Sequence, residues 1–199
     1  NMSDTNLKLN EINELATKIL LKYGCDNENA SAVANVIEAA EAAGCHSHGL
    51  MRLPGYVATL KSGKVNGKAR PTIENLAPAV VKVNGHNGFA PYALQQGRSH
   101  LIAAANKCGI AVMSLVGIHH FAALWPEVEA LAERHLVGIA CVRSMPVVAP
   151  FGGRTALFGT NPLAFAWPRT NIPPFVFVLS TFHMAHAEVS IDACSGLSG

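Results

Sequence analysis

The stretch IAVMSLVGIHHFAALWPEVEALAERHLVGIACV, residues 110–142, decides the fold class. It opens with an almost wholly apolar run that predicts a buried strand over residues 110–116, and the Gly-Ile-His-His at 117–120 predicts a loop. Residues 122–135 are mostly apolar, with three glutamates on the side expected to face solvent, which indicates an amphipathic helix. A second apolar strand is predicted at 137–142. A strand, a helix and another strand in such quick succession are typical of an α/β sheet.

The residues before this stretch predict a helical segment. In residues 7–23, apolar side chains recur at three- and four-residue steps, and a glycine follows, so this run predicts a helix with one apolar face. Further helices are predicted over residues 27–44 and 50–61. Because the periodicity changes after these helices, we place a boundary there. It separates a helical N-terminal segment, residues 1–64, from an α/β domain, residues 65–199.

The α/β domain is expected to contain further alternating elements. In chain order these are a strand at 79–84, a turn at 85–88, a helix at 89–107, a glycine- and proline-rich loop at 146–161, and strands at 163–167 and 175–179. The last two strands are apolar enough to be buried on both faces, yet too little chain follows to cover them, so we expect them to expose apolar surface. No two glycines are separated by a single residue, so the Gly-x-Gly-x-x-Gly fingerprint of the Rossmann fold is absent. The predicted fold is therefore α/β (α+β), with a mixed sheet of non-Rossmann type.

The composition excludes several classes of protein. Half of the 199 residues are hydrophobic, which argues against disorder, and the net charge of +2 offers no basic surface for nucleic acid. No apolar run is long enough to span a membrane. The five cysteines are widely spaced and form no Cys-x-x-Cys pair, so we expect reduced, buried thiols and neither a disulfide frame nor a metal site. These observations favour a cytoplasmic protein that acts on a small molecule.

The first candidate site is Gly-Cys-His-Ser-His-Gly-Leu-Met-Arg at residues 44–52. Arg52 lies four residues after His48, a spacing that places both side chains on one face of a helix. His48 could then exchange a proton with a substrate while Arg52 binds its carboxylate. Alternatively, Ser47 caps the helix and Arg52 pairs with a surface acid, and spacing alone favours this interpretation. A metal site at His46 and His48 ranks lower, because no third ligand follows at a useful spacing.

Two further stretches are candidates for ligand binding. The strand-to-helix turn at residues 117–126 offers backbone N–H groups to a phosphate, although its histidines could equally cap the helix while Phe121, Leu124 and Trp125 join the core. The loop from 150 to 162 contains glycines that would let the backbone approach a ligand, and Thr160 could supply a hydroxyl. Its Asn-Pro pair is also an ordinary turn sequence.

Taken together and in this order, these segments resemble the malate/L-lactate dehydrogenase type 2 family. The resemblance runs from about residue 15 to residue 169, with a thinner continuation to residue 196. The matching motifs are His46-Ser47-His48-Gly49 with Arg52 and Gly55-Tyr56, Asn87-Gly88, Gly117-x-His119-His120 and Gly159-Thr160-Asn161-Pro162. As a set they favour the functional interpretation of His48 and Arg52 over the cap.

Within that family, the sequence HHFAALWP at residues 119–126 resembles that of the Δ1-piperideine-2-carboxylate/Δ1-pyrroline-2-carboxylate reductases. The resemblance implies an oxidoreductase that reduces a cyclic imine carboxylate to L-pipecolate or L-proline, with NADPH (or NADH) as the cofactor, and it implies a homodimer. One alternative is an NAD-dependent 2-hydroxy-acid dehydrogenase acting on malate, lactate or ureidoglycolate. An alternative of another class is a truncated, non-catalytic remnant, because family members continue well beyond residue 199 and the resemblance thus implies a C-terminally truncated chain.

The resemblance also implies a role for each site residue. Ser47, His48 and Glu188 would form a proton relay, and Arg52 and Thr160 would hold the substrate. The cofactor would lie against His120, Phe121, Ala122, Ala123 and Leu124, and against Val178, Leu179 and Ser180. At the last three positions this chain departs from the family, which has Phe-Asp followed by small residues where this chain has Phe177-Val178-Leu179. This chain thus lacks the family's carboxylate and carries bulkier side chains where the resemblance places cofactor contacts.

Overall fold

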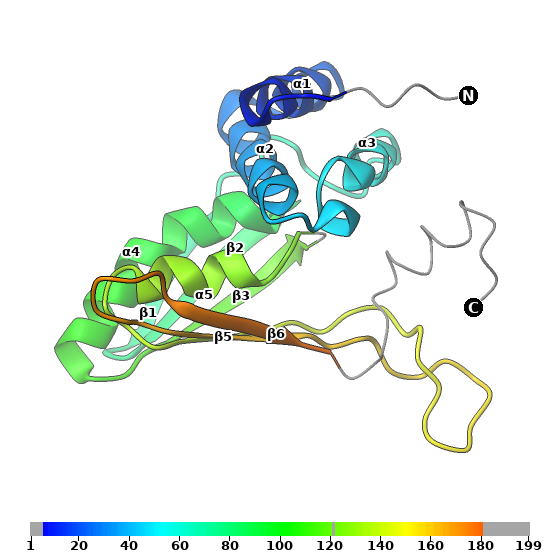
Figure 1. The fold of residues 1–199 in the computed structure, drawn as a ribbon. Coiled ribbons are helices and arrows are strands. Elements are labelled where there is room, and N and C mark those ends of the chain that lie inside the picture. Colours follow the sequence, from blue (N-terminus) through cyan, green and yellow to red (C-terminus); the bar gives the residue numbers. More distant parts are fainter. Residues whose placement is uncertain (1–5, 121, 181–199) are drawn as a thin grey trace. The chain divides into compact units, whose positions relative to one another are not determined.

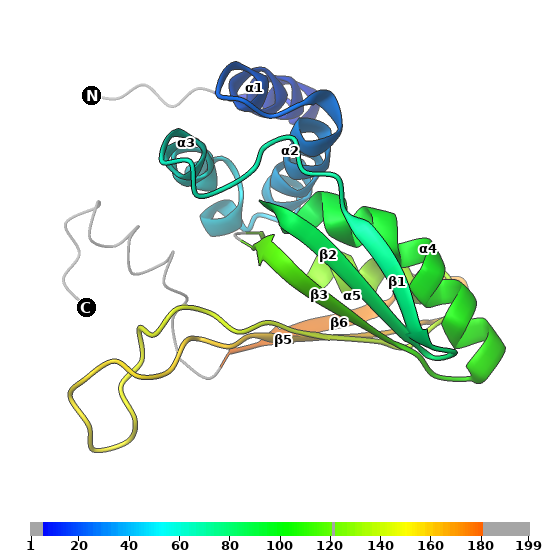
Figure 2. The same ribbon diagram turned by 180° about the vertical axis from the view of Figure 1, so that it is seen from behind.

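A computed structural model describes residues 6–120 and 122–180 (Figures 1 and 2). The chain divides into two compact units, residues 1–122 and 123–199, and each is described by itself. The domain boundary expected after residue 64 falls inside the first unit, where helices give way to strands, and stays a prediction. Among the described residues, every helix is too short or too polar to cross a lipid bilayer.

The first unit begins with the predicted helices. They are α1 (Leu9–Lys22), α2 (Asn27–Ala42) and α3 (Leu53–Lys61), and two short 3-10 turns, η1 (His46–His48) and η2 (Leu50–Arg52), precede α3. The apolar stripe of α1, which includes Ala16 and Leu20, is buried against Val33 and Ile37 of α2. The third helix starts later than the predicted residue 50, because 3-10 turns replace its first residues.

A three-stranded sheet completes the first unit. Its elements are β1 (Thr72–Ala77), β2 (Val80–Phe89), α4 (Ala90–Cys108) and β3 (Val112–His119), and the strand order is β1-β2-β3. β1 runs antiparallel to β2, whereas β3 runs parallel to it, so α4 is a crossover helix. Val81, Val83 and Ala93 form the buried core between β2 and α4. The sheet is therefore mixed, as predicted.

Three predictions about this sheet are corrected. Residues 85–88 are not a turn that ends the strand but a bulge inside β2, where the pairing with β3 shifts between Asn84 and Gly88. β1 was not predicted, since its sequence TIENLA is polar and mostly exposed. β3 runs on to His119, through most of the predicted loop, and it is not buried: Val112 is 56% exposed. In strands with one open face, apolar sequence alone does not establish burial.

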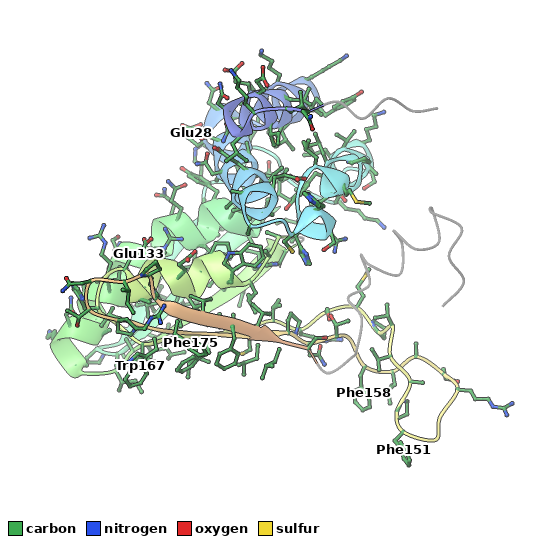
Figure 3. The ribbon with its side chains drawn as sticks, in the orientation of Figure 1. Glu28, Glu133, Phe151, Phe158, Trp167 and Phe175 are labelled. Carbon is green, nitrogen blue, oxygen red and sulfur yellow. The ribbon has the colours of Figure 1, made fainter. Side chains whose placement is uncertain are left out.

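The second unit pairs one helix with an antiparallel sheet. It contains α5 (Trp125–Ala132), β4 (Gly138–Cys141), β5 (Leu163–Trp167) and β6 (Phe175–Leu179), with the strand order β4-β5-β6. Val128 of α5 packs against Ala164 and Ala166 of β5. The opposite face carries Trp167 and Phe175, which are 53% and 50% exposed (Figure 3). The apolar surface that we expect β5 and β6 to expose is therefore present among the described residues.

The cysteines are only in part the buried thiols that we expected. Cys25 is buried, and burial raises the pKa of its thiol to about 11, so it stays protonated. Cys45 is half-buried, whereas Cys108 and Cys141 are exposed. Cys194 lies outside the described residues. In the described part of the chain, no group of three or more His, Cys, Asp or Glu side chains is placed to hold a metal ion.

Candidate active site

The segment after α2 brings Ser47 and His48 into contact. Gly44 has a φ of 69°, which allows the chain to turn sharply at the end of the helix. Ser47 is buried, and its Oγ lies 3.0 Å from Nδ1 of His48. The Sγ of Cys45 lies 3.5 Å from the same nitrogen. A hydroxyl and a thiol thus hold one nitrogen of the imidazole, which orients the ring.

The alternative in which Ser47 caps the next helix is wrong. The N-cap residues of η2 and α3 are Gly49 and Arg52, and neither makes a cap hydrogen bond with its own side chain. Because the hydroxyl of Ser47 is directed at His48, the pairing of these two side chains that the sequence motif predicts is present in the structure.

Arg52 lies at the end of η2 as a partly buried cation. Its Nε is buried and has no hydrogen-bond partner among the described residues. Burial lowers the pKa of the guanidinium, and the nearby Tyr56 and Cys45 act in the opposite direction. The ion pairs of the described residues do not include Arg52, so the surface-acid alternative has no support there. A buried N–H without a partner favours an anionic ligand that would accept its hydrogen bond.

Tyr56 and Phe89 connect this segment with the end of the sheet. Tyr56 is fully buried, and burial raises the pKa of its hydroxyl above its ordinary value. Its ring meets the ring of Phe89 edge-on, with 4.9 Å between the centroids. Phe89 is the last residue of β2 and pairs with His119, the last residue of β3. Figure 2 shows the end of β3 pointing toward the cyan η1–η2 segment. The motif at residues 46–52 and the motif at residues 117–120 therefore lie at the same end of the first unit.

The bulge in β2 explains why Asn87 and His119 belong to the same motif set. His86 and Asn87 have φ values of 46° and 65°, so the strand changes direction there. Oδ1 of Asn87 lies 2.8 Å from Nε2 of His119, and its Nδ2 donates to the carbonyl of Lys64 at 2.6 Å. The amide of Asn87 thus orients the imidazole that precedes His120. The sequence pattern predicts no role for Asn87, because the residues of this bulge are turn-forming residues and predict a turn.

The predicted cofactor residues just before α5 differ in their burial. Ala122 and His120 are half-buried at the end of the first unit. Ala123 and Leu124 are 3% and 5% exposed, and Leu124 belongs to the core beneath β5. The interpretation of Leu124 as a core residue is thus confirmed. The N-cap residue of α5 is Leu124, whose side chain makes no cap hydrogen bond, and the alternative in which the histidines cap this helix stays a prediction.

In the second unit, Thr160 and Ser180 are brought together. The Oγ of Ser180 donates to the carbonyl of Thr160 at 3.2 Å. The hydroxyl of Thr160 lies 3.0 Å from Oγ of Ser144, and the backbone N–H of Asn161 donates to the same Oγ at 3.0 Å. Ser144 was not predicted, because a single loop serine gives no sequence signal.

The remaining predicted residues divide into two groups. Val178 and Leu179 pair with Ala164 and Leu163 in β5, and as neighbours in a strand they point to opposite faces of the sheet. Phe121 and Glu188 lie outside the described residues.

Residues 7–197 match the malate/L-lactate dehydrogenase family. A Δ1-pyrroline-2-carboxylate/Δ1-piperideine-2-carboxylate reductase of Pseudomonas aeruginosa is 44% identical over 96% of this chain and 57% of its own length. The solved Δ1-piperideine-2-carboxylate reductase of Pseudomonas syringae has a TM-score of 0.92 at 44% identity, covering 97% of this chain and 58% of that one. Malate dehydrogenase of Entamoeba histolytica has a TM-score of 0.90 at 27% identity, covering 98% and 54%. This chain therefore spans a little over half the length of these relatives, and it belongs to the malate/L-lactate dehydrogenase family.

Proposed function

We propose that this chain acts in an NADPH-dependent oxidoreductase that reduces a cyclic imine carboxylate, Δ1-piperideine-2-carboxylate or Δ1-pyrroline-2-carboxylate, to L-pipecolate or L-proline. The observation that carries the proposal is the buried Arg52 Nε without a partner among the described residues, four positions beyond the oriented His48. The names of the reductases that this chain resembles support the same substrate class.

Arg52 is proposed to bind the substrate carboxylate. A guanidinium offers two parallel N–H donors to a carboxylate, which fixes both the position and the plane of the ligand. Because Arg52 is partly desolvated, an ionic hydrogen bond there is stronger than one at an exposed site. Thr160 is proposed as a second substrate-binding residue. Both contacts would decide which face of the ring is reduced.

His48 is proposed to supply the proton. In the reduction, C2 of the imine gains a hydride, the electron pair of the C=N bond moves to nitrogen, and the nitrogen takes up a proton. When bound, the reduced nicotinamide supplies that hydride. Ser47 holds Nδ1 of His48, so Nε2 is the nitrogen that we propose exchanges the proton. Glu188 is proposed as the acid of this relay.

The cofactor is proposed to lie along residues 120–124 and 178–180. Residues 117–126 contain no acidic side chain, so a polyanionic dinucleotide meets no charge repulsion there. Because Ala123 and Leu124 are buried, their contribution would come from backbone groups. We further propose NADPH as the preferred cofactor, a cytoplasmic location and a homodimer, all drawn from the family resemblance. Light scattering of the purified protein tests the last of these.

A second candidate is an NAD-dependent dehydrogenase of malate, lactate or ureidoglycolate. The structural similarity to a malate dehydrogenase favours it, and the same His48 and Arg52 could serve a 2-hydroxy acid. The test offers the purified protein NADPH with Δ1-piperideine-2-carboxylate, and separately NAD+ with each hydroxy acid. The proposal predicts NADPH oxidation with the imine. Turnover of a hydroxy acid without imine reduction would favour the second candidate, and no turnover in either assay would contradict both.

A further inference from the structure

Glu41, near the carboxyl end of α2, makes two hydrogen bonds to the segment that carries Ser47 and His48. Its Oε2 lies 2.5 Å from Nδ1 of His46. Its Oε1 accepts a hydrogen bond from the backbone N–H of Leu50 at 2.7 Å. The Glu41 side chain is only 12% exposed, so this carboxylate faces the segment and not the solvent.

The two partners of Glu41 stand on either side of Ser47 and His48. His46 precedes them, and Leu50 follows as the first residue of η2. The first N–H groups of a helix lack partners within that helix, and here the carboxylate accepts one of them although it comes from another helix. Glu41 therefore ties both ends of the loop to α2 and limits the backbone conformations available to His48.

The same carboxylate explains why residue 49 is a glycine. A Cβ at this position would collide with Oε1 of Glu41. It would also lie only 2.5 Å from Cδ and 2.8 Å from Cγ of the same side chain. Because Glu41 is held by two hydrogen bonds and is almost buried, it cannot move aside at low cost. Any larger residue at 49 would have to displace either the carboxylate or the loop.

We propose that Glu41 is a positioning residue, which sets the geometry of the Ser47–His48 pair by bracing His46 and Leu50 and touches neither substrate nor cofactor. The inference rests on the proposed function, because it takes His48 as the proton donor. It predicts that Glu41 affects the turnover number and leaves cofactor affinity unchanged.

The first test compares three substitutions of Glu41 in the purified protein. Glu41→Ala removes both hydrogen bonds, and we expect kcat to fall about 10- to 100-fold, as expected for a small misplacement of a reacting group. Glu41→Gln keeps the length and an acceptor for Leu50, and should recover most of kcat. Glu41→Asp keeps the charge but is one methylene shorter, so it should resemble Ala. If Asp retains activity and Gln does not, charge and not position is responsible, and the proposal is wrong.

A matched control is available one turn earlier on α2. Glu38 accepts a hydrogen bond from Asn13 at 2.7 Å, and within the described part of the chain its side chain forms no hydrogen bond or ion pair with the loop. Glu38→Ala removes a carboxylate from the same helix, and we expect a wild-type kcat. A fall equal to that of Glu41→Ala would mean that both variants act only by weakening α2, which would overturn the proposal.

The second test uses coupling and a spectroscopic readout that needs no turnover. Gly49→Ala should lower kcat strongly in the wild type but far less in the Glu41→Ala background, because the collision partner is gone. The ¹⁵N resonances of the His48 ring, recorded without cofactor or substrate, should move in Glu41→Ala and stay in place in Glu41→Gln. If the His48 resonances do not move in Glu41→Ala and the effects of Gly49→Ala and Glu41→Ala on kcat are additive, the positioning role is refuted. The proposed reduction would still stand. If the resonances move but the wild type reduces no imine, the positioning role stands and the proposed function fails.

Discussion

The segment of Ser47 and His48 and the loop of Thr160 are held together in different ways. In the first, the hydrogen bonds join residues between one and nine positions apart, from the Ser47–His48 pair to the Glu41–Leu50 bond. In the second, Ser144 reaches Thr160 across 16 positions, and Ser180 reaches it across 20. The first arrangement is local and needs only α2 and one tight loop. The second forms only after β5 and β6 have paired.

This difference predicts that substitutions in the local segment act mainly on chemistry, whereas those in the long-range loop act on substrate binding. His48→Asn and Ser144→Ala test this difference directly, whereas Arg52→Lys and Asp26→Asn probe substrate binding and stability outside these two segments. They follow in order of decreasing expected effect.

His48→Asn should cause the largest loss, because it removes the proposed proton donor. We expect kcat to fall by about 10²- to 10⁴-fold, the usual contribution of general acid catalysis. Single-turnover reduction of the cyclic imine measures the effect, and circular dichroism checks that the protein folds. Near-normal turnover would show that His48 does not supply the proton. It would also contradict the claim that the local segment acts mainly on chemistry.

Arg52→Lys should act on substrate affinity. Lysine keeps the charge but lacks the planar pair of donors, so we expect KM to rise by about 10- to 100-fold, with the dissociation constant for NADPH unchanged. Titration of NADPH by fluorescence supplies the second measurement. If cofactor affinity collapses and KM does not change, Arg52 faces the nucleotide.

Ser144→Ala should produce a smaller effect in the long-range loop. The substitution removes a hydrogen bond to the Thr160 hydroxyl and one from the Asn161 N–H. The hydrogen bond to the Thr160 hydroxyl, which is the one of the two that bears on substrate binding, is worth roughly 1 kcal/mol, so KM should rise about 5-fold while kcat stays close to wild type. Initial rates over a range of imine concentrations decide this. A loss in kcat alone would show that this loop does not serve substrate binding.

Asp26→Asn should change only the pH dependence of stability. Asp26 caps α2, accepts from the N–H of Asn29 at 3.0 Å and forms an ion pair with Arg70. Although burial opposes the shift, hydrogen bonds from Asn29 and Arg70 and the charge of Arg70 hold the pKa of Asp26 below its ordinary 3.8. The carboxylate therefore stabilises the fold above pH 3.8, and this contribution is lost as the pH falls through the folded pKa.

Asparagine has no such titration and is itself a good cap. The wild type should be more stable than Asp26→Asn at neutral pH, by at most about 1 kcal/mol, and the difference should vanish in acid. Urea unfolding at several pH values measures it. A difference that stays constant below pH 3.8 would mean that the charge of Asp26 contributes nothing.

The same distinction explains what the sequence could predict. Ile12, Ala16 and Leu20 are buried at the helical spacing read from the sequence, because an amphipathic helix needs only local periodicity. The Ser47–His48 contact is implied by the family resemblance, whereas spacing alone favours Ser47 as a helix cap. Ser144 could not be found in this way, since its partners are defined by strand pairing.

The limits on the fold prediction have the same origin. β1 has no apolar alternation, and it exists because β2 offers it an edge with which to pair. The bulge at residues 84–88 contains turn-forming residues and was therefore interpreted as the end of a strand. Glu41 gave no signal either, because its importance lies in two hydrogen bonds to a loop that the sequence does not place.

The central claim is that His48 and Arg52 act on an imine that carries a carboxylate. The most direct test is the ratio of kcat/KM for Δ1-piperideine-2-carboxylate to that for Δ1-piperideine, which lacks the carboxylate, in the wild type and in Arg52→Met. We predict that the wild type prefers the carboxylate by at least about 100-fold, because a site built to bind a polar group rejects the analogue without it, and that Arg52→Met loses this preference. Equal rates with both imines in the wild type, or a preference that survives in Arg52→Met, would contradict the account.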